Sequence, residues 1–308
     1  MTREIGDIVK LWESRPGEAF ALATLVGTRG SSYRLPGARM LIASDGMSAG
    51  SLSGGCLEEE VIQHSREVIR SGTPSLLTID TRLRFGCHGS IAMLVERAGD
   101  DFLAGLAERR RDRRCGRAAT TYEGEFDLGS RWLRDDEIVS RNAFVQEILP
   151  SLQLLVIGDG PDCVALRQFS SALGWSWRQV ENASQLRGGY DEWTAALVKT
   201  HNFGRDFAAL RALLPMGLRY VGLLGPRRRR EQLLGDLLDT GVQVSENLFA
   251  PAGQNLGGDA PESIALAVIA EIHAVFAARP GNHLRDIRAP IHPDRQNDSN
   301  ALAFGGIS

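Results

Sequence analysis

The stretch from Ser51 to Glu58, Ser-Leu-Ser-Gly-Gly-Cys-Leu-Glu, combines two adjacent glycines with a thiol and a carboxylate. Gly54 and Gly55 allow backbone conformations that are closed to other residues, and they allow a bound group to approach closely. Cys56 stands at the start of an expected helix, whose end lowers the pKa of a thiol, although the following glutamates oppose that lowering. Two interpretations are open: a small-molecule or anion site with a reactive thiol, or a tight strand-to-helix turn with a buried cysteine.

A second thiol lies in another glycine-flanked loop, Gly86-Cys87-His88-Gly89. Two thiols in the glycine-rich loops of one domain could ligate a soft metal, attack an electrophile or sense the redox state. The alternative is an ordinary loop, in which His88 is a surface or core residue.

The loop from Gly27 to Met40 contains three arginines and feeds the strand that leads toward Cys56. The planar guanidinium group suits bidentate contact with phosphate or carboxylate, so Arg34 and Arg39 are candidate ligand-binding residues. A polar loop can equally be a solvated connection. The functional interpretation is favoured because the strand that follows this loop also leads to the Cys56 turn.

These residues require an N-terminal α+β domain to position them. Apolar spacing predicts helices at 5–12, 57–69 and 102–114, and strands at 20–26, 38–42, 76–79, 91–95 and 118–122. Asp45-Gly46 predicts a turn. The polar stretch from Asp127 to Asn142 is expected to be loop-rich packing or a linker, and Pro150 marks the domain boundary.

The second half begins as a Rossmann-like unit. An apolar strand from Leu152 to Ile157 runs into Gly158-Asp159-Gly160-Pro161, a helix follows, and a second strand ends at the acid Glu181. In dinucleotide-binding folds such an acid reads ribose hydroxyls. The fingerprint is incomplete, because Cys163 replaces the third glycine, Pro161 removes an amide donor, and two aspartates place negative charge where a pyrophosphate would sit. We therefore expect the fold but not tight NAD(P) binding.

Two further segments fall at the carboxyl ends of strands in the same predicted parallel sheet, where α/β proteins bind ligands. One is Thr200-His201-Asn202, and the other is Gly225-Pro226-Arg227, which opens a helix. Helix amides together with guanidinium groups form a good phosphate or carboxylate receptor. Arg229 and Arg230 fit a solvated basic face at least as well.

The whole chain of 308 residues is expected to form domains at 1–150 and 151–280, followed by a flexible tail at 281–308. The net charge of -3 gives no electrostatic argument for nucleic acid or a membrane. No apolar run is long enough to span a bilayer and no signal-peptide core is present, so a cytoplasmic location is expected. The 4 cysteines are then expected to be reduced thiols.

The chain resembles the XdhC/CoxI family, the maturation factors of molybdenum hydroxylases such as xanthine dehydrogenase. The similarity runs in order from about Ile5 to Phe276. It rests on the motifs Arg34-Leu35-Pro36-Gly37-Ala38-Arg39-Met40, Asp45-Gly46, Gly54-Gly55-Cys56-Leu57-Glu58, Gly86-Cys87-His88-Gly89, Val198-Lys199-Thr200-His201-Asn202, Tyr220-Val221-Gly222-Leu223-Leu224-Gly225 and Pro261-Glu262-Ser263-Ile264-Ala265. The family pattern Gly-Ala-Gly-His is replaced by Gly158-Asp159-Gly160-Pro161.

The resemblance implies a cytoplasmic, dimeric chaperone that binds molybdenum cofactor, supports its sulfuration and inserts it into an apo-hydroxylase, with a cysteine desulfurase as a further partner. No turnover of a free metabolite is expected. The predicted cofactor-binding residues are Arg34, Arg39, Gly54, Gly55, Cys56, Glu58, Cys87, Gly158, Gly160, His201, Gly225, Arg227 and Glu262, with Cys56 as the candidate contact to molybdenum. Two other functions fit parts of the sequence: an NAD(P)-dependent oxidoreductase that uses the second half, and a thiol sulfurtransferase that uses Cys56 or Cys87.

Overall fold

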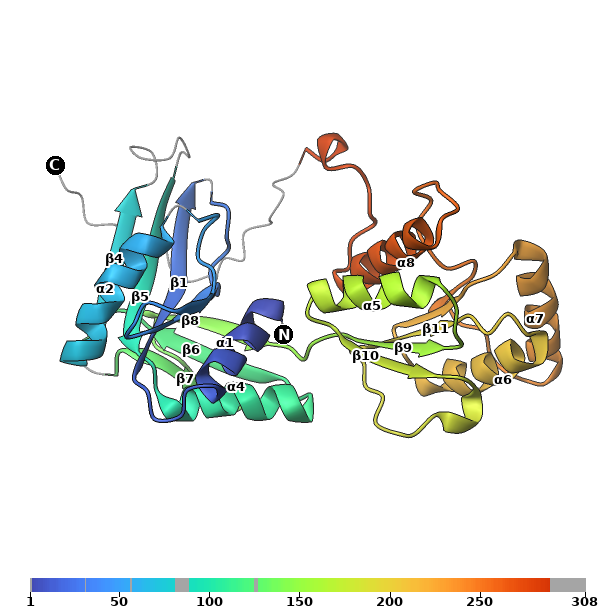
Figure 1. Cartoon of the computed structure of the whole chain (residues 1–308), viewed down its shortest axis with the longest axis horizontal. Coiled ribbons are helices and arrows are strands. Elements are labelled where there is room, and N and C mark those ends of the chain that lie inside the picture. Colours follow the sequence, from blue (N-terminus) through green and yellow to red (C-terminus); the bar gives the residue numbers. More distant parts are fainter. Residues whose placement is uncertain (1, 31, 56, 81–88, 125–126, 289–308) are drawn as a thin grey trace. The chain divides into compact units, whose positions relative to one another are not determined.

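The computed structural model describes residues 2–30, 32–55, 57–80, 89–124 and 127–288, and the chain divides into two compact units between Pro150 and Ser151 (Figure 1). Each unit has its own sheet and its own core. In the described part of the chain, no helix combines the length and the apolar character needed to cross a membrane.

The N-terminal unit is built on a five-stranded antiparallel sheet with the order β3-β2-β1-β5-β4. Its strands are β1 (Phe20–Gly30), β2 (Arg39–Ala43), β3 (Ser48–Gly50), β4 (Ser75–Asp80) and β5 (Gly89–Arg97). The helices are α1 (Arg3–Glu13), α2 (Glu58–Ser71) and α4 (Asp100–Asp112). Apolar residues of α2 pack on one face of the sheet, whereas those of α1 and α4 pack on the other. Both faces are therefore covered, and every residue of β2 is buried.

A second, three-stranded antiparallel sheet completes this unit with the order β7-β6-β8. It contains β6 (Gly116–Thr121), β7 (Gly129–Trp132) and β8 (Ala143–Ile148). The expectation of a loop-rich or linker segment at 127–142 is wrong for β7. Its sequence, Gly-Ser-Arg-Trp, has no apolar alternation, and tertiary contacts hold it: Ser130 donates its backbone N–H to Glu96, and Trp132 stacks on Phe102.

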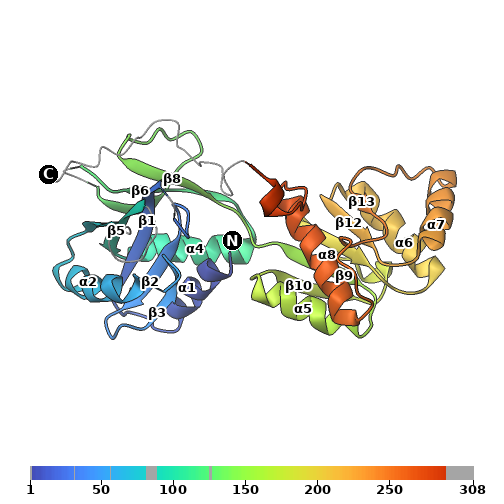
Figure 2. The ribbon, with the colours of Figure 1, turned by 90° about the horizontal axis from the view of Figure 1, so that it is seen from above.

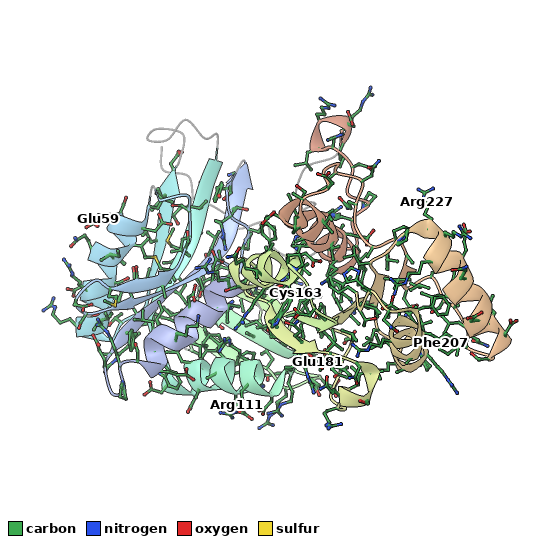
Figure 3. All side chains as sticks on the ribbon, turned by 45° about the vertical axis from the view of Figure 1, so that its right-hand side comes forward. Glu59, Arg111, Cys163, Glu181, Phe207 and Arg227 are labelled. Atoms are coloured by element: carbon green, nitrogen blue, oxygen red, sulfur yellow. The ribbon has the colours of Figure 1, made fainter. Side chains whose placement is uncertain are left out.

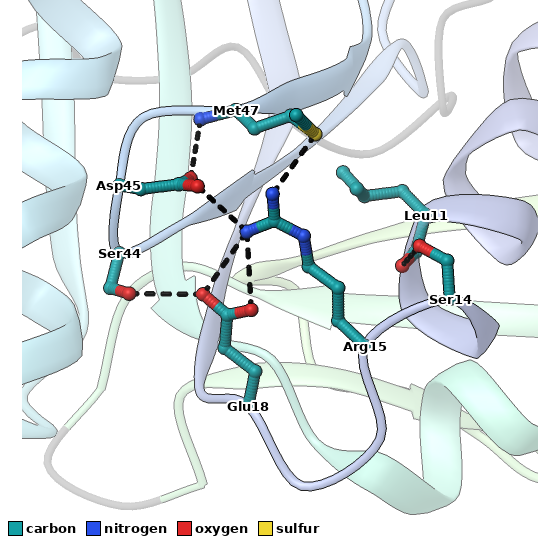
Figure 4. Close-up of polar contacts among 7 residues, drawn as sticks. All are labelled: Leu11, Ser14, Arg15, Glu18, Ser44, Asp45 and Met47. Atoms are coloured by element: carbon teal, nitrogen blue, oxygen red, sulfur yellow. Dashed lines mark hydrogen bonds and ion pairs between the residues drawn. The ribbon is translucent and has the colours of Figure 1, made fainter.

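The predicted Asp45-Gly46 turn joins β2 to β3, and Gly46 has a φ of 90° that favours glycine. Arg15, in the connection after α1, fixes this turn from outside (Figure 4). Its Nη1 lies 2.9 Å from Asp45 Oδ2 and 3.2 Å from Glu18 Oε2. The backbone N–H of Met47, followed by the Arg15 guanidinium, lowers the pKa of Asp45. The hairpin that leads to the Cys56 loop is thus tied to the chain entering β1.

The C-terminal unit is a parallel sheet with the strand order β10-β9-β11-β12-β13. The strands are β9 (Gln153–Ile157), β10 (Ser176–Val180), β11 (Thr194–Val198), β12 (Tyr220–Leu223) and β13 (Leu248–Phe249). The helices are α5 (Asp162–Ala172), α6 (Phe203–Leu213), α7 (Arg227–Asp239) and α8 (Pro261–Phe276). One core cluster lies under α5 and α8, and another lies under α6 and α7 on the opposite face (Figures 1 and 2).

This architecture confirms the predicted fold class of an α+β domain followed by a Rossmann-like domain. The strand order places β10 on one side of β9 and β11 on the other. The chain therefore reverses direction across the sheet at the carboxyl end of β9, and such switch points are where open α/β sheets bind ligands.

We predict that Gly50→Ala destabilises the protein more than Gly17→Ala. Both glycines have positive φ, 88° and 78°, which costs alanine about 1–2 kcal/mol. A Cβ at Gly50 would also lie 2.2 Å from the carbonyl oxygen of Arg39, whereas one at Gly17 would meet no atom of the described residues within 4 Å. The expected total for Gly50→Ala is about 2–5 kcal/mol. Urea unfolding followed by circular dichroism measures both variants, and equal losses would contradict this packing constraint.

Candidate functional sites in the two units

Glu58 is the first residue of α2, and its carboxylate turns back onto the loop that precedes the helix. It accepts hydrogen bonds from both the backbone and the side chain of Ser53, from Ser51 Oγ at 3.0 Å, and from the backbone N–H of Leu57 at 3.1 Å. The amide of Leu52 contributes a longer bond of 3.3 Å. One side chain therefore fixes both ends of the glycine-rich loop.

The charge state of Glu58 follows from these bonds. Partial burial by itself raises the pKa of the carboxyl group, but the Ser53 hydroxyl, the Ser53 amide and neighbouring amides outweigh it and lower the pKa to about 2. The carboxylate is consequently ionised at neutral pH, and it is a charged acceptor for loop donors that α2 itself cannot satisfy.

The two glycines of this loop face solvent. Among the described residues, no atom lies within 4 Å of the position of a Cβ on Gly55, whose φ is 106°, and Gly54 meets only the ring of Tyr33 at 4.0 Å. Tyr33 itself is 76% exposed. The loop is therefore held in shape from beneath and open on its outer side. Cys56 and Cys87, the two predicted thiols, lie outside the described residues.

Arg34 forms a bidentate ion pair with Glu4 of α1, with Nη1 2.6 Å from Oε1 and Nη2 in contact with Oε2. Both side chains are about one-quarter to one-third exposed, at 27% and 29%. The guanidinium is reachable from solvent, but a phosphate could take the bidentate position only by replacing the Glu4 carboxylate.

Arg39 lies in the core, with 2% of its surface exposed. Its Nη1 donates to Gln146 Oε1 and to the carbonyl of Gly37, and the guanidinium lies 5.6 Å from the centre of the Phe102 ring. Burial lowers the pKa of Arg39 to about 10, and the charge of Glu96 partly offsets that effect. The geometry gives Arg39 a role in packing, and its contact with cofactor stays a prediction.

Glu96 was not singled out from the sequence. It is 5% exposed and accepts the backbone N–H of Ser130 at 2.8 Å. Burial raises its pKa, while Ser130 and the Arg39 charge act in the opposite direction. A glutamate near the end of an apolar strand carries no sequence signal that distinguishes this position from an exposed one.

In the C-terminal unit, Gly158 and Gly160 follow β9, and both positions require glycine. Their φ values are 117° and 146°. A Cβ on Gly158 would lie 2.5 Å from the Lys199 carbonyl oxygen, and one on Gly160 would lie 2.8 Å from Lys199 Nζ. The loop is thus packed directly against the residue that follows β11.

Lys199 is fully buried beneath that loop. Its Nζ lies 2.8 Å from Asp162 Oδ1, 2.7 Å from the Asp159 carbonyl oxygen and 3.4 Å from Cys163 Sγ. The negative charge of Asp162 is therefore compensated from within rather than presented to a ligand. Burial raises the pKa of Cys163 despite the neighbouring lysine, so this thiol is protonated at neutral pH. The one sequence feature that could have drawn attention to Lys199 is its position just after a buried parallel strand, where α/β proteins place functional residues.

His201 follows with a φ of 55° in the loop between β11 and α6. The buried Asp206 orders this loop, because its Oδ1 accepts both the amide and the hydroxyl of Thr200. Its other oxygen forms an ion pair with Arg229 in the first turn of α7. The solvated face suggested for Arg229 is thus wrong, since that side chain is only 18% exposed. The pair links the His201 loop to the helix opened by Gly225 and Arg227.

A cavity of about 720 Å³ opens at this edge of the sheet. It is lined by residues that include Gly158, Asp159, Gln179, Glu181, Thr200 and Arg205. Glu181 directly follows β10, as predicted for a ribose-reading acid (Figure 3). Gly225, Arg227 and Glu262 begin or precede other helices and are not among the lining residues. Within the described ranges, no three His, Cys, Asp or Glu residues gather to hold a metal ion.

Comparison with protein families identifies both units. Residues 14–80, which include the Arg34 loop and the Gly54-Gly55 turn, match the XdhC and CoxI family, and residues 154–272 match the XdhC Rossmann domain. The chain belongs to the XdhC and CoxI family. The resemblance drawn from the motifs is thereby confirmed.

Relatives of this XdhC/CoxI protein align over most of its length. A Bacillus subtilis protein named as a probable xanthine dehydrogenase subunit is 29% identical, over 83% of this chain and 92% of its own. The Escherichia coli molybdenum cofactor insertion chaperone PaoD is 24% identical, over 84% of each chain. A crystal structure described as a xanthine dehydrogenase from Bacillus halodurans shares the fold, with a TM-score of 0.76, 23% identity and coverage of 89% and 96%.

We predict that Glu58→Gln weakens the folded state by about 1–2 kcal/mol at neutral pH, because an amide replaces a charged acceptor that is only partly buried. The pKa of Glu58 is lower in the folded protein than its ordinary value of 4.5. The ionised carboxylate therefore stabilises the folded wild type above about pH 4.5, and this contribution is lost as the pH falls toward 2. Urea unfolding between pH 7 and pH 3 tests this.

The matched control is Glu59→Gln, the next residue along α2, whose side chain is exposed and whose substitution should change stability by less than about 0.5 kcal/mol. If the two variants lose stability equally, Glu58 does not hold the loop.

We also predict that Arg39→Met destabilises the protein by about 1–3 kcal/mol, because Gln146 and the Gly37 carbonyl lose their buried donor and the positive charge that offsets burial of Glu96 is removed. The double variant with Glu96→Gln should recover part of that loss. Urea unfolding measures all three proteins. An Arg39→Met protein with unchanged stability would show that the arginine is not a packing residue.

Proposed function

We propose that this XdhC/CoxI protein binds molybdenum cofactor, supports its sulfuration and inserts it into a xanthine dehydrogenase-type hydroxylase. The names of two relatives support the proposal, since one is a molybdenum cofactor insertion chaperone and the other is named for xanthine dehydrogenase. The apo-hydroxylase is the proposed client, a cysteine desulfurase the proposed sulfur source, and a homodimer the proposed assembly. The protein acts on cofactor as cargo and turns over no free metabolite.

The observation that carries the proposal is the loop held by Glu58. Five donors of residues 51–57 converge on that one carboxylate, which leaves Gly54 and Gly55 on the open side of a fixed turn. A preformed loop binds with a smaller loss of conformational entropy than a mobile one. The cysteine between Gly55 and Leu57 supplies the soft ligand that molybdenum or a transferred sulfur requires.

The cargo also carries a phosphate. Of the two arginines predicted to bind cofactor in this unit, Arg34 is the one whose side chain is partly exposed, whereas Arg39 is embedded in the core. The bidentate fork of Arg34 suits a phosphate as well as it suits Glu4. In this proposal Cys56 contacts the metal end of the cofactor, and Arg34 binds its phosphate end.

We predict that Cys56→Ala reduces the cofactor retained by the purified protein by about tenfold or more, because the soft ligand is lost. Retained molybdenum is measured by mass spectrometry of the metal, and retained pterin by the fluorescence of its oxidised form. The control is Cys115→Ala, which removes an exposed cysteine outside the motif and should leave retention unchanged.

The alternatives give different results in the same preparations. A persulfide on Cys56 of a wild-type protein that retains no cofactor would point to a sulfurtransferase and contradict the chaperone. Binding of NADH at micromolar concentration, followed by fluorescence, would instead support an oxidoreductase.

A further inference from the structure

The cavity of the C-terminal unit lies where a Rossmann fold normally binds a dinucleotide. In that arrangement the pyrophosphate sits on the amides of the first strand-to-helix loop, and an acid after the second strand accepts the ribose hydroxyls. Here the corresponding parts are the loop from Gly158 to Cys163 and the carboxylate of Glu181, and both contribute to this edge of the sheet.

One amide of the pyrophosphate position, that of Gly160, is taken by the chain itself. The backbone N–H of Gly160 donates to Asp159 Oδ1 at 2.8 Å, and Gln179 Nε2 donates to the same oxygen at 3.2 Å. A carboxylate thus lies on the amide that a phosphate oxygen would use. A second negative group at this place would be repelled as well as sterically excluded.

Two other amides of the loop are also engaged within the chain. The N–H of Gly158 donates to the Val180 carbonyl at 2.8 Å, that of Cys163 donates to the Gly160 carbonyl at 3.1 Å, and Pro161 has none. Lys199 cannot substitute for them, because it is fully buried and its Nζ is paired with Asp162.

The acid that would accept ribose hydroxyls is present in the lining. Glu181 directly follows β10, and Gln185, Thr200 and Arg205 are further lining residues. The Thr200 hydroxyl already donates to Asp206, and the Gln185 carboxamide oxygen accepts the Glu181 amide. Asp159 and Glu181 together outweigh the single charge of Arg205, so the cavity has an excess of negative charge. Hydroxyl groups are the natural donors to such carboxylates, whereas phosphates are disfavoured.

We propose that this cavity binds an uncharged ribonucleoside, with its ribose diol on Glu181, and that Asp159 excludes the diphosphate that a dinucleotide fold ordinarily holds. The site is separate from the Glu58 loop, and the proposal does not depend on the function proposed for that loop.

Calorimetric titration of the full chain tests the proposal. The probes are the four common ribonucleosides and, for the one that binds most tightly, its 2′-deoxy form and its 5′-diphosphate. The wild type should bind the nucleoside at least as tightly as the diphosphate. The deoxy form should bind about tenfold more weakly, because Glu181 loses a hydroxyl donor.

Two variants of Asp159 distinguish the effect of its negative charge from the effect of its hydrogen bond to the Gly160 amide. Asp159→Ala frees the Gly160 amide and should strengthen binding of the diphosphate by about tenfold or more while leaving the nucleoside unchanged. Asp159→Asn keeps an acceptor on that amide but removes the charge, and its gain should be smaller. Glu181→Gln keeps an acceptor but removes its charge, so the difference between the ribo and deoxy forms should become smaller. Asp239→Ala and Glu246→Gln, at exposed positions that do not line the cavity, are the controls.

Circular dichroism confirms that each variant is folded before titration. A wild type that binds none of the four ribonucleosides at millimolar concentration overturns the proposal. So does a wild type that binds the diphosphate more tightly than the nucleoside, or an Asp159→Ala protein with no gain for the diphosphate.

Discussion

Both units depend on one constraint: the amide groups at a glycine-rich turn before a helix have no partner in the helix and must find one elsewhere. In each unit a carboxylate of the chain provides it. Glu58 takes the amides of Ser53 and Leu57, and Asp159 takes that of Gly160. The consequences differ, because Glu58 lies beneath its loop and leaves the glycines open, whereas Asp159 covers the amide that a ligand would use. A carboxylate bound to loop amides therefore leaves the Gly54-Gly55 turn open to a ligand, whereas it disfavours anions at the Gly158–Gly160 turn.

Buried charge is the second theme of the molecule. The ion pairs Lys199–Asp162 and Arg229–Asp206 place charged groups in or near the core of the C-terminal unit, and Arg39 and Glu96 are each buried in the N-terminal unit. Removing one partner of such a pair leaves the other uncompensated, so these side chains resist substitution even where they touch no ligand. The two ion pairs connect separate segments: the residue after β11 with the start of α5, and α6 with the start of α7. These buried charged side chains hold in place the elements that flank the Glu58 loop and the Gly158–Gly160 loop.

The sequence predicted most of the regular elements, because apolar periodicity reports one-sided burial directly. It predicted the βαβ unit, the Asp45-Gly46 turn and the acid after β10. It did not predict β7, whose four residues pair through backbone bonds and a Trp132 stack rather than through an apolar pattern. It also placed Arg39 among the ligand-binding residues, since this arginine falls in the polar, glycine-containing stretch from Gly27 to Met40. Here the sheet is covered on both faces, and only tertiary structure shows that.

The Arg34 pair shows how binding of a phosphate in the N-terminal unit would be coupled to the rest of the unit. The bidentate position is held by Glu4, which belongs to α1, and α1 packs on the face of the sheet opposite α2. Exchange of that carboxylate for a phosphate keeps the guanidinium paired but releases a charged side chain of α1. The free energy of phosphate binding is therefore the difference between two ion pairs rather than the gain of a new one. Anion affinity at this loop is consequently set by the Glu4 contact as much as by the loop itself, and a ligand recognised through sulfur or molybdenum requires no such exchange.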